Sequence, residues 1–517
     1  MAGLKWAGAG LLAAILIGIV RPAAAQTYSV NCTTSGNTAL QTLINSPSYT
    51  GGSITITGTC LGNITLYYGT TFYADPSGGT IQGRVEVYGT GMFCGGGLVL
   101  EGDGTNSVVL WAHDQSLLLI QGCTIQNGGN DGLYAETGSI IDFSGSGNSI
   151  INNGNHGIEA SDGVVIRLGA INPNPGGTPD STQAVTISGN TADGIHLSGR
   201  SSIKGYYAFI NGNQGNAVYL SDASSASFIA GSIMAPTGGT MPWLIQVQGG
   251  SSLRLDGIDN CCDSAIAPNG VILATGNSNV TIYQTTLIQQ SYSSNPAIQA
   301  LGGANLYIED SNVSGDGNGA VSISGNASAF LYGSTIVGRG SGSGCANPNP
   351  TMTAAGGSTI TLAGGNAISN ALNGLALSVQ NASTLIQGGA TSLLPGSGFA
   401  NAVDTISGSA CIKTYSNMEL GSTKDSGSGV QWNGSNLVIT VQQTSLARLD
   451  GNNVTINGEL LLDQGGDGYF NQNNWSGSGT ANAISSVVCN NVESRITNPG
   501  EVSPAVATGA PPGCATF

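Results

Sequence analysis

An apolar residue recurs at nearly regular intervals through the middle of the chain, usually after a small residue and before a short strand pattern. The eleven intervals between successive members range from 23 to 37 residues. Repeats of this length indicate structural units that stack on one another, because a single unit cannot bury its own apolar face. We call these twelve residues the marker positions: Leu133, Ile158, Ile195, Val218, Ile245, Val271, Ile298, Val321, Met352, Leu375, Val403 and Val430.

Each repeat contains short runs rich in β-branched residues. Runs such as residues 139–143, 164–168 and 280–283 are bounded by Gly, Asn or Ser and have no helical period, which is typical of strands. Glycine contributes 82 of the 517 residues and charged residues only 8%, which excludes a helical bundle. Two or three strands in about 25 residues predict one coil of a parallel β-solenoid, whereas a propeller would need antiparallel units of about 40 residues.

The chain resembles the right-handed parallel β-helix proteins of the pectin-lyase-like superfamily over roughly residues 50–480, and residues 53–66 are similar to the way many of them begin. The resemblance implies an all-β fold, a single right-handed parallel β-helix (solenoid). We expect a short N-terminal capping helix that starts at Asn37, carries Leu40, Leu43 and Ile44 on its apolar stripe, and ends before Pro47. The expected domains are an N-terminal cap over 26–50, the β-helix over 51–480, and a C-terminal cap or tail over 481–517.

The first 25 residues have the pattern of a secretory signal peptide. Lys5 precedes an apolar run over residues 7–20, and small residues follow at 23–25. No later segment is apolar enough to span a membrane as a helix. The ten cysteines of an exported chain predict disulfides, and zinc is the weaker interpretation because no histidine lies at ligand spacing from a cysteine. We therefore expect a secreted or extracytoplasmic protein, in a periplasm or at a cell surface.

The net charge is −16 with only 12 Lys and Arg residues, so the chain has no basic surface that could attract nucleic acid. The expected partners are a polysaccharide or a cell-surface matrix, and the expected oligomeric state is a monomer. Calcium binding stays possible for several acidic clusters, but none has the spacing of a known calcium loop. No metal ligand set is predicted.

Stacked coils place residues at equal offsets from the markers in rows about 5 Å apart. The row two positions before the marker contains acids and a histidine, the row one position after it contains Tyr, Glu and His, and the row nine positions after it contains Asp142, Arg167 and Lys204. A carboxylate beside an imidazole raises its pKa and orients it for proton transfer. The candidate catalytic residues are therefore Asp131, His156, Glu159, Asp193 and His196, and the candidate substrate-binding residues are Tyr134, Arg167, Lys204 and Tyr219.

A structural interpretation competes with this site. Asp142, Arg167 and Lys204 can form a surface charge ladder, and Asp or His before glycine can serve turn geometry. The stretch 190–194 is similar to part of a polygalacturonase motif, but no complete catalytic motif of the superfamily is present, so no catalytic role is transferred. Trp111 can stack on a sugar ring or pack in the core.

Two functions follow as hypotheses. The first is an exported β-helix protein that engages a polysaccharide along a lateral face and, if it is an enzyme, processes it as a lyase, glycoside hydrolase or epimerase. The alternative is a non-catalytic surface or adhesive rod protein. A groove over residues 133–219 would distinguish the enzyme from the rod.

Overall fold

The computed structural model describes much of the chain up to residue 387 and only the strands beyond residue 403. The described residues before that point are 26–33, 38–105, 107–170, 179–235, 243–258, 270–289, 295–317, 319–340, 350–363, 366–370, 375–379 and 383–387. The predicted signal peptide over 1–25 lies outside them. The chain divides into two compact units, Met1–Asn213 (unit 1) and Gln214–Phe517 (unit 2), and each is described by itself.

Unit 1 is a parallel β-solenoid in which each coil contributes strands to three columns. The first column contains β3 (Ile64–Leu66), β5 (Val85–Tyr88), β8 (Leu110–His113), β11 (Leu133–Ala135), β14 (Ile158–Ala160) and β17 (Ile195–Leu197). The second contains β6 (Gly91–Gly95), β9 (Leu117–Gln121), β12 (Ile140–Phe143) and β15 (Val165–Leu168). The third contains β7 (Val99–Glu101), β10 (Thr124–Gln126), β13 (Asn148–Ile151) and β16 (Val185–Ser188).

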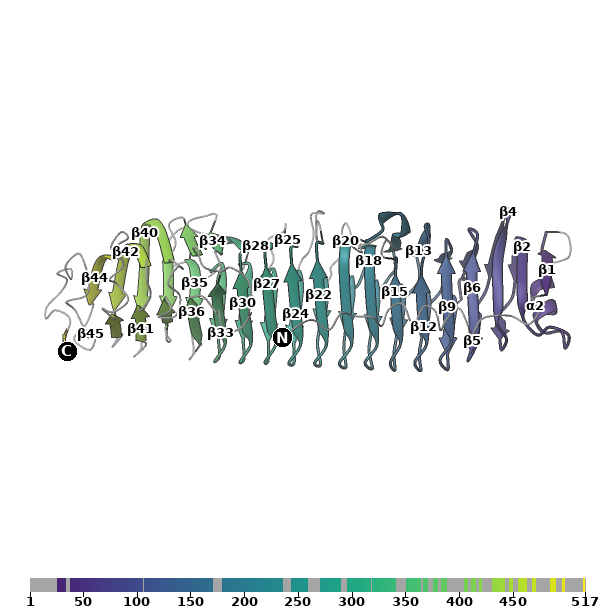
Figure 1. Ribbon diagram of the computed structural model, residues 1–517, viewed down its shortest axis with the longest axis horizontal. Helices are drawn as coiled ribbons and strands as arrows, with labels where there is room; N and C mark the ends of the chain where they lie inside the picture. The colour runs from purple at the N-terminus through teal and green to yellow at the C-terminus, as the bar shows by residue number, and fades with distance from the viewer. Residues whose placement is uncertain are drawn as a thin grey trace, which may run out of the picture. The chain divides into compact units, whose positions relative to one another are not determined.

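Three longer strands of unit 1 run through the second and third columns: β2 (Gly52–Leu61), β4 (Thr70–Gln82) and β18 (Ser202–Asn211). An additional strand, β1 (Thr27–Asn31), pairs in parallel with β2, so parallel pairing already starts within the segment expected to be the cap. Figure 1 shows β9, β12 and β15 side by side, as the register requires.

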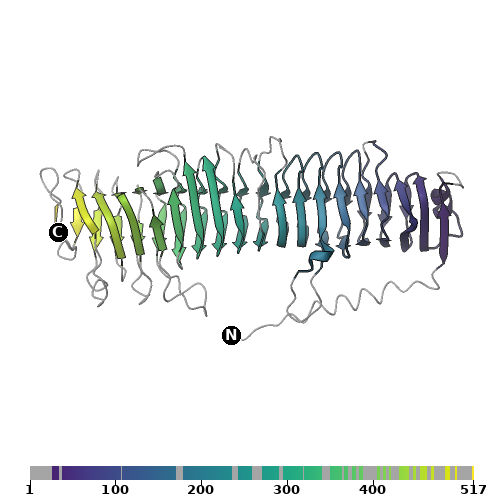
Figure 2. The ribbon, with the colours of Figure 1, turned by 90° about the horizontal axis from the view of Figure 1, so that it is seen from above.

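The predicted N-terminal helix is present as α2 (Ala39–Ile44), which packs beside β1, β2 and β3 and ends before Pro47 as expected. Its N-cap is Thr38, whereas Asn37 lies outside the described residues. Leu40 is fully buried. Figure 2 shows this helix at the purple end of unit 1. The only other helical element in the described residues is a 3₁₀ turn, η1 (Ser181–Gln183), capped by the Asp180 side chain.

Unit 2 is also a parallel β-solenoid. One set of its strands comprises β19 (Val218–Leu220), β21 (Ile245–Val247), β23 (Ile272–Thr275), β26 (Ile298–Leu301), β29 (Val321–Ser324), β32 (Met352–Ala355), β35 (Leu375–Val379) and β38 (Cys411–Thr414). A second set comprises β25 (Thr286–Ile288), β28 (Asn312–Gly317), β31 (Thr335–Gly340), β34 (Ala367–Asn370) and β37 (Asp404–Ser407). The last strands of the two sets, β37 and β38, both pair with β40 (Val430–Val441). β40 pairs with β42 (Val454–Leu462), which pairs with β44 (Ile484–Cys489).

The remaining set in unit 2 comprises β20 (Ser225–Met234), β22 (Ser252–Asp256), β24 (Asn279–Tyr283), β27 (Asn305–Glu309), β30 (Ser328–Tyr332), β33 (Thr359–Ala363), β36 (Thr384–Gln387), β39 (Met418–Leu420), β41 (Leu446–Leu449), β43 (Asp467–Phe470), β45 (Arg495–Thr497) and β46 (Ala515–Thr516). Parallel pairing thus continues past residue 480. Every strand pair described in either unit is parallel, which confirms the solenoid and excludes an antiparallel propeller.

The marker positions are in register in most coils. Leu133, Ile158 and Ile195 pair directly, and all three are fully buried. Three markers were placed wrongly. Ile245 pairs with Ile272 rather than Val271, and Met352 pairs with Leu377 rather than Leu375. Val430 pairs with Asp404 of β37, whereas the marker series continues from Leu377 through Ile412 to Ile439. Val403 lies outside the described residues.

Two disulfides tie neighbouring coils together in the core of unit 1. They join Cys32 to Cys60 and Cys94 to Cys123, and all four residues are buried. Their sequence separations of 28 and 29 residues are close to one coil. The other six cysteines carry no described side chain. The prediction of disulfides is therefore confirmed for four of the ten cysteines.

Candidate functional site

The first column of unit 1 presents one row of outward side chains. Its short strands alternate, so that in β11 Leu133 and Ala135 are buried while Tyr134 between them is half-buried on the outer face. The register places five successive strands side by side along this row, with Glu86, Trp111, Tyr134, Glu159 and His196 as its members. The predicted row from Tyr134 through Glu159 to His196 is confirmed within unit 1, and the row extends in the N-terminal direction to Trp111 and Glu86.

A glycine lies directly before each of the strands β11, β14 and β17, and an acidic residue or a histidine precedes each glycine. Asp131, His156 and Asp193 are each followed by glycine. A side chain at Gly157 would meet the Asn190 amide nitrogen and the Gly194 carbonyl oxygen at 2.7 Å each, so only glycine allows adjacent coils to approach this closely. Glycine at this position therefore lets the coils pack closely, and this packing brings the Asp and His side chains together.

A buried asparagine ladder supports the turn from inside. The Asn190 side-chain oxygen accepts hydrogen bonds from the backbone N–H and side-chain NH₂ of Asn153 at 3.0 and 2.9 Å. The Asn190 NH₂ donates in turn to the Asn213 oxygen at 2.8 Å. All three residues are at most 1% exposed, so every bond lies in an environment where losing it is costly. The ladder holds the residues just before β14 and β17 in fixed positions.

His156, Asp193 and His196 form one hydrogen-bonded group. Asp193 donates its backbone N–H to Nδ1 of His156 at 3.1 Å, and its Oδ2 lies 3.1 Å from Nδ1 of His196 and 3.5 Å from Nδ1 of His156. The two imidazole rings meet edge to face, with centroids 4.7 Å apart. Burial lowers the pKa of His156, although the neighbouring charge of Asp193 opposes the effect. His156 is therefore neutral near pH 7, with an unprotonated Nδ1.

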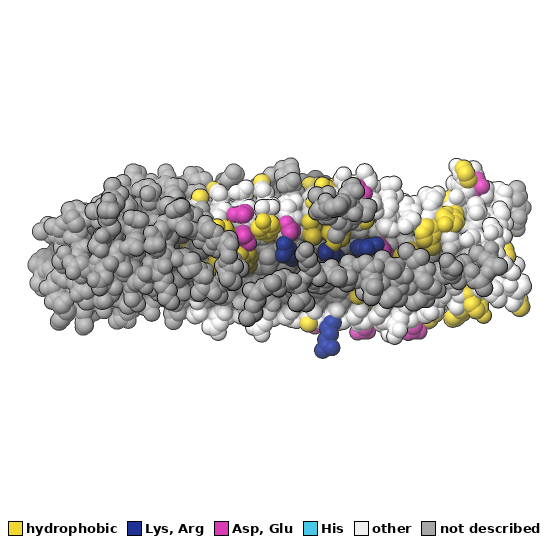
Figure 3. Space-filling view, in the orientation of Figure 1, with side chains coloured by type: hydrophobic (Ala, Val, Ile, Leu, Met, Phe, Trp, Pro, Cys, Tyr) yellow, Lys and Arg dark blue, Asp and Glu magenta, His cyan; other side chains and the backbone are white. Residues whose placement is uncertain are grey.

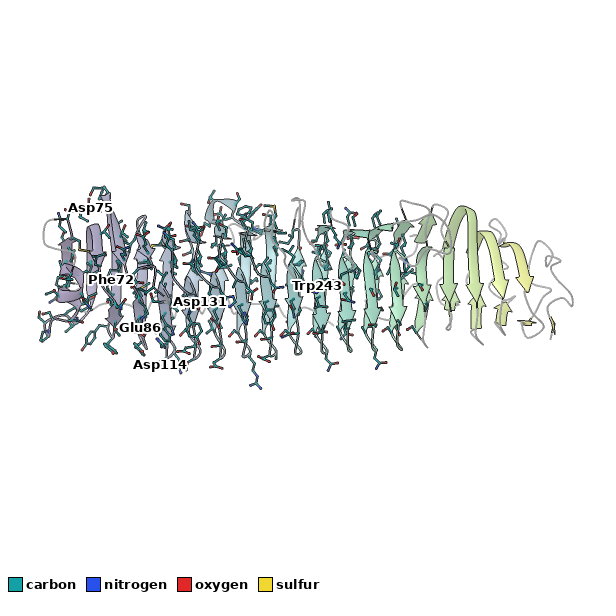
Figure 4. All side chains as sticks on the ribbon, turned by 180° about the vertical axis from the view of Figure 1, so that it is seen from behind. Phe72, Asp75, Glu86, Asp114, Asp131 and Trp243 are labelled. Carbon is teal, nitrogen blue, oxygen red and sulfur yellow. A yellow bond between two sulfur atoms is a disulfide. The ribbon has the colours of Figure 1, made fainter. Side chains whose placement is uncertain are left out.

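Asp131 and Glu159 form the other half of the cluster. Asp131 accepts hydrogen bonds from the Asn155 side chain and the His156 backbone N–H at 2.9 and 3.0 Å. Burial, followed by the charge of Asp131 and a hydrogen bond with it, raises the pKa of Glu159 to about 7. Glu159 therefore keeps its proton to a much higher pH than an ordinary glutamate, because a second negative charge beside Asp131 is unfavourable. Figure 4 labels Asp131 on unit 1, together with Glu86 of the outward row.

The structure brings together all five candidate catalytic residues: Asp131, His156, Glu159, Asp193 and His196. It places Arg167 and Lys204 elsewhere, in the second column, in register with Asp142. Arg167 forms a bidentate ion pair with Asp142, and the Lys204 ammonium lies over the Tyr206 ring. These contacts match the predicted surface ladder. Tyr219 belongs to unit 2, where its hydroxyl accepts a hydrogen bond from Gln248.

The sequence pattern missed a second cluster on the same column. His113 lies between Glu136, 2.6 Å from its Nδ1, and Glu86, 3.5 Å from its Nε2. Its ring stacks on Tyr88 and Trp111 with centroids 4.3 and 4.2 Å apart. The marker series began at Leu133, but Leu110 and Val85 continue it in register. Extending the series by two coils would have found this cluster.

Charged side chains are sparse on the surface. The face of the molecule in Figure 3 is mostly uncharged polar side chains and backbone among the described residues. In the described part of unit 1, the ion pairs made by arginine join Arg84 to Glu86 and Arg167 to Asp142.

Comparison with family models, with curated proteins and with solved structures found no match to this chain. No helix among the described residues is long and apolar enough to cross a membrane. The two disulfides agree with an extracytoplasmic location.

Proposed function

We propose that the protein is an exported, pectin-lyase-like β-helix enzyme that engages a polysaccharide along the first column of unit 1 and transfers protons at the cluster of Glu159 and His196. The observation that carries the proposal is the register, which sets Trp111, Tyr134, Glu159 and His196 in one outward row on adjacent strands. Four strands at a spacing of about 4.8 Å cover roughly 14 Å, the length of a short oligosaccharide. Flat aromatic rings beside polar groups suit sugar rings.

The cluster supports a reaction that begins with removal of a proton from carbon. His196 donates through Nδ1 to the Asp193 carboxylate in its neutral form, which makes its Nε2 the basic nitrogen. Glu159 retains a proton near pH 7 and can donate it. A base and an acid in one cluster suit elimination or epimerisation of a uronic acid unit.

Each of these reactions balances with the two groups. His196 takes the proton from the carbon next to the sugar carboxyl group. The electron pair left on that carbon then either forms a double bond or accepts a new proton. In elimination the glycosidic oxygen on the adjacent carbon leaves and takes the Glu159 proton. In epimerisation Glu159 gives its proton to the same carbon from the opposite face, so that His196 ends protonated and Glu159 ends ionised.

Inverting hydrolysis fits this pair less well. An inverting glycosidase separates its two carboxyl groups by roughly 6.5–9.5 Å to admit a water molecule. Asp131 and Glu159 are hydrogen-bonded to each other instead, and they have oxygens within 4.8 Å.

The experiment is a screen of the full-length protein against neutral and uronic acid polysaccharides. Binding is measured by co-sedimentation, unsaturated ends by ultraviolet absorbance, inversion at carbon by NMR, and reducing ends by colour assay. We expect Glu159→Gln and His196→Ala to lower turnover by about a hundredfold or more while binding persists, and Trp111→Ala to weaken binding. Arg167→Ala, on the second column, is the matched control and should change neither.

Two results would overturn the proposal. The first is the absence of binding to every polysaccharide in the panel, which would favour a non-catalytic rod protein. The second is turnover that survives unchanged in the double variant Glu159→Gln/His196→Ala. New reducing ends without unsaturation would replace elimination by hydrolysis and contradict the reaction class.

A further inference from the structure

Two histidines and one carboxylate converge at the cluster in a way that the proposed proton transfer does not require. Asp193 Oδ2 lies 3.1 Å from Nδ1 of His196 and 3.5 Å from Nδ1 of His156. One ligand atom from each of these three residues lies within 4.8 Å of the others. Their side chains are 12–25% exposed, so an ion could enter from solvent.

These separations match the ligand spacing of a small divalent metal ion. Zinc binds nitrogen and carboxylate oxygen at about 2.0–2.2 Å, and tetrahedral geometry then separates neighbouring ligand atoms by roughly 3.4 Å. The two contacts of Asp193 Oδ2 fall on either side of that value. A central ion could therefore be bound with small movements of the three side chains.

The protonation state of His156 is already the one that a metal needs. The backbone N–H of Asp193 points at Nδ1 of His156, which fixes the tautomer with that nitrogen unprotonated. A metal ion would bind the lone pair of Nδ1 in place of the hydrogen bond from the Asp193 N–H. Metal binding to a protonated imidazole would instead have to release a proton first.

The local charge also favours a cation. Three carboxyl groups, those of Asp131, Glu159 and Asp193, lie around the two imidazoles. A divalent ion would offset the charge that the carboxylates place on one small patch.

We propose that His156, Asp193 and His196 bind one divalent transition-metal ion of the zinc class. Two imidazoles and one carboxylate are the ligand set that such metals prefer, whereas calcium and magnesium prefer oxygen ligands alone. With three protein ligands, a fourth position would remain for water or substrate. A metal ion here would use Asp193 and Nδ1 of His196, whose mutual hydrogen bond the proposed reaction keeps, so metal binding and the proposed proton transfer are alternative uses of the same cluster. Metal binding is measured without polysaccharide, so its test does not depend on the proposed reaction.

The experiment uses the full-length protein without a histidine tag, after dialysis against a chelator and then against metal-free buffer. Zn²⁺ is titrated by calorimetry, and bound metal is counted by elemental analysis. We expect one Zn²⁺ per chain, no competition from an excess of Ca²⁺, and binding at least about tenfold weaker in His156→Gln and His196→Gln. Because the chain has three histidines in all, His113→Gln is the matched control and should bind Zn²⁺ as the wild type does.

Histidine NMR of the unaltered protein tests the same site without relying on the folding of a variant. Zn²⁺ should shift the ring signals of His156 and His196 and leave those of His113 in place. The proposal is overturned if the wild type binds no Zn²⁺, or if His113→Gln weakens binding as much as the other two variants. It is also overturned if Glu159→Gln abolishes binding while His196→Gln does not, since the ion would then use Asp131, His156 and Glu159.

Discussion

Replacing Glu159 with glutamine should stabilise the protein above neutral pH and have a much smaller effect in mild acid. The pKa of Glu159 is about 7 in the folded chain, against an ordinary value of 4.5, mainly because the group is partly buried and secondarily because of Asp131. The folded state therefore holds more protons than the unfolded state between these values. The stability contributed by this proton is complete below about pH 4.5 and is lost as the pH rises through about 7.

The expected gain in unfolding free energy follows from the difference between the folded and unfolded pKa values of Glu159. A rise in pKa from 4.5 to about 7 corresponds to roughly 3 kcal/mol at full strength. Partial exposure of the carboxyl reduces this to about 1–3 kcal/mol. Glutamine resembles the protonated acid at every pH, so Glu159→Gln should exceed the wild type by that amount near pH 8 and by much less near pH 5.

The effect of His156 on stability must be separated from that of Glu159. The pKa of His156 is lowered, so its contribution to stability changes with pH in the opposite direction. That contribution is present above the ordinary histidine value of 6.5 and is lost as the pH falls through the lower folded value. Subtracting the wild-type curve from the variant curve removes it. The assay is urea unfolding of chelator-treated protein from about pH 5 to about pH 8. Glu101→Gln, in the third column, is the control.

The reasoning is refuted if the unfolding free energies of wild type and Glu159→Gln run parallel across this range. Glu159 would then be ionised at neutral pH in spite of its surroundings. A gain of the same size in Glu101→Gln would also refute it, since the effect would reflect net charge rather than the cluster. Asp131→Asn offers a second check: it should lower the pKa of Glu159, and carbon-13 NMR of labelled glutamate would show the change.

Three further changes test the scaffold. Asn190→Ala leaves buried donors without an acceptor and should cost about 2–4 kcal/mol in urea unfolding, while Ser149→Ala, which loses one half-buried bond, should cost less than about 1 kcal/mol. The double variant Cys94→Ser/Cys123→Ser opens a loop of 29 residues and should lower unfolding free energy by roughly 3–4 kcal/mol, whereas reducing agent should lower that of the wild type further because it also opens Cys32–Cys60. Arg167→Ala breaks an exposed ion pair and should shift the unfolding free energy by at most about 1 kcal/mol.

The sequence predicts the register wherever one apolar residue marks the strand. Leu133, Ile158 and Ile195 pair as expected because each is the first inward residue of a three-residue strand. The prediction fails at Val271 because its neighbour Ile272 is also fully buried. Spacing cannot choose between two adjacent buried residues, since the choice is made by the hydrogen bonds between strands.

The sequence predicts which site residues share a row, but not on which face of the coil that row lies. Asp142 and Arg167 pair in register as expected, yet they lie in the second column because nine residues carry the chain around a corner of the coil. Sequence offsets give the members of a row, whereas the position of the corner depends on turn geometry. This is why Lys204 belongs to a correct row and still lies apart from the cluster around Glu159.

A constant offset within each coil explains why the cluster could be predicted across an insertion. Glu159 pairs with His196, Arg167 with Lys204, and Asn148 with Val185, all 37 residues apart, although these pairs lie in three different columns. The proline-rich segment lengthens the interval for all of them equally. Ligand spacing rules drawn from helices and short loops cannot find such a group, because His156 and His196 come together only through the register. Rows should fail where the offset changes inside a coil, as it does in β35 between Leu375 and Leu377.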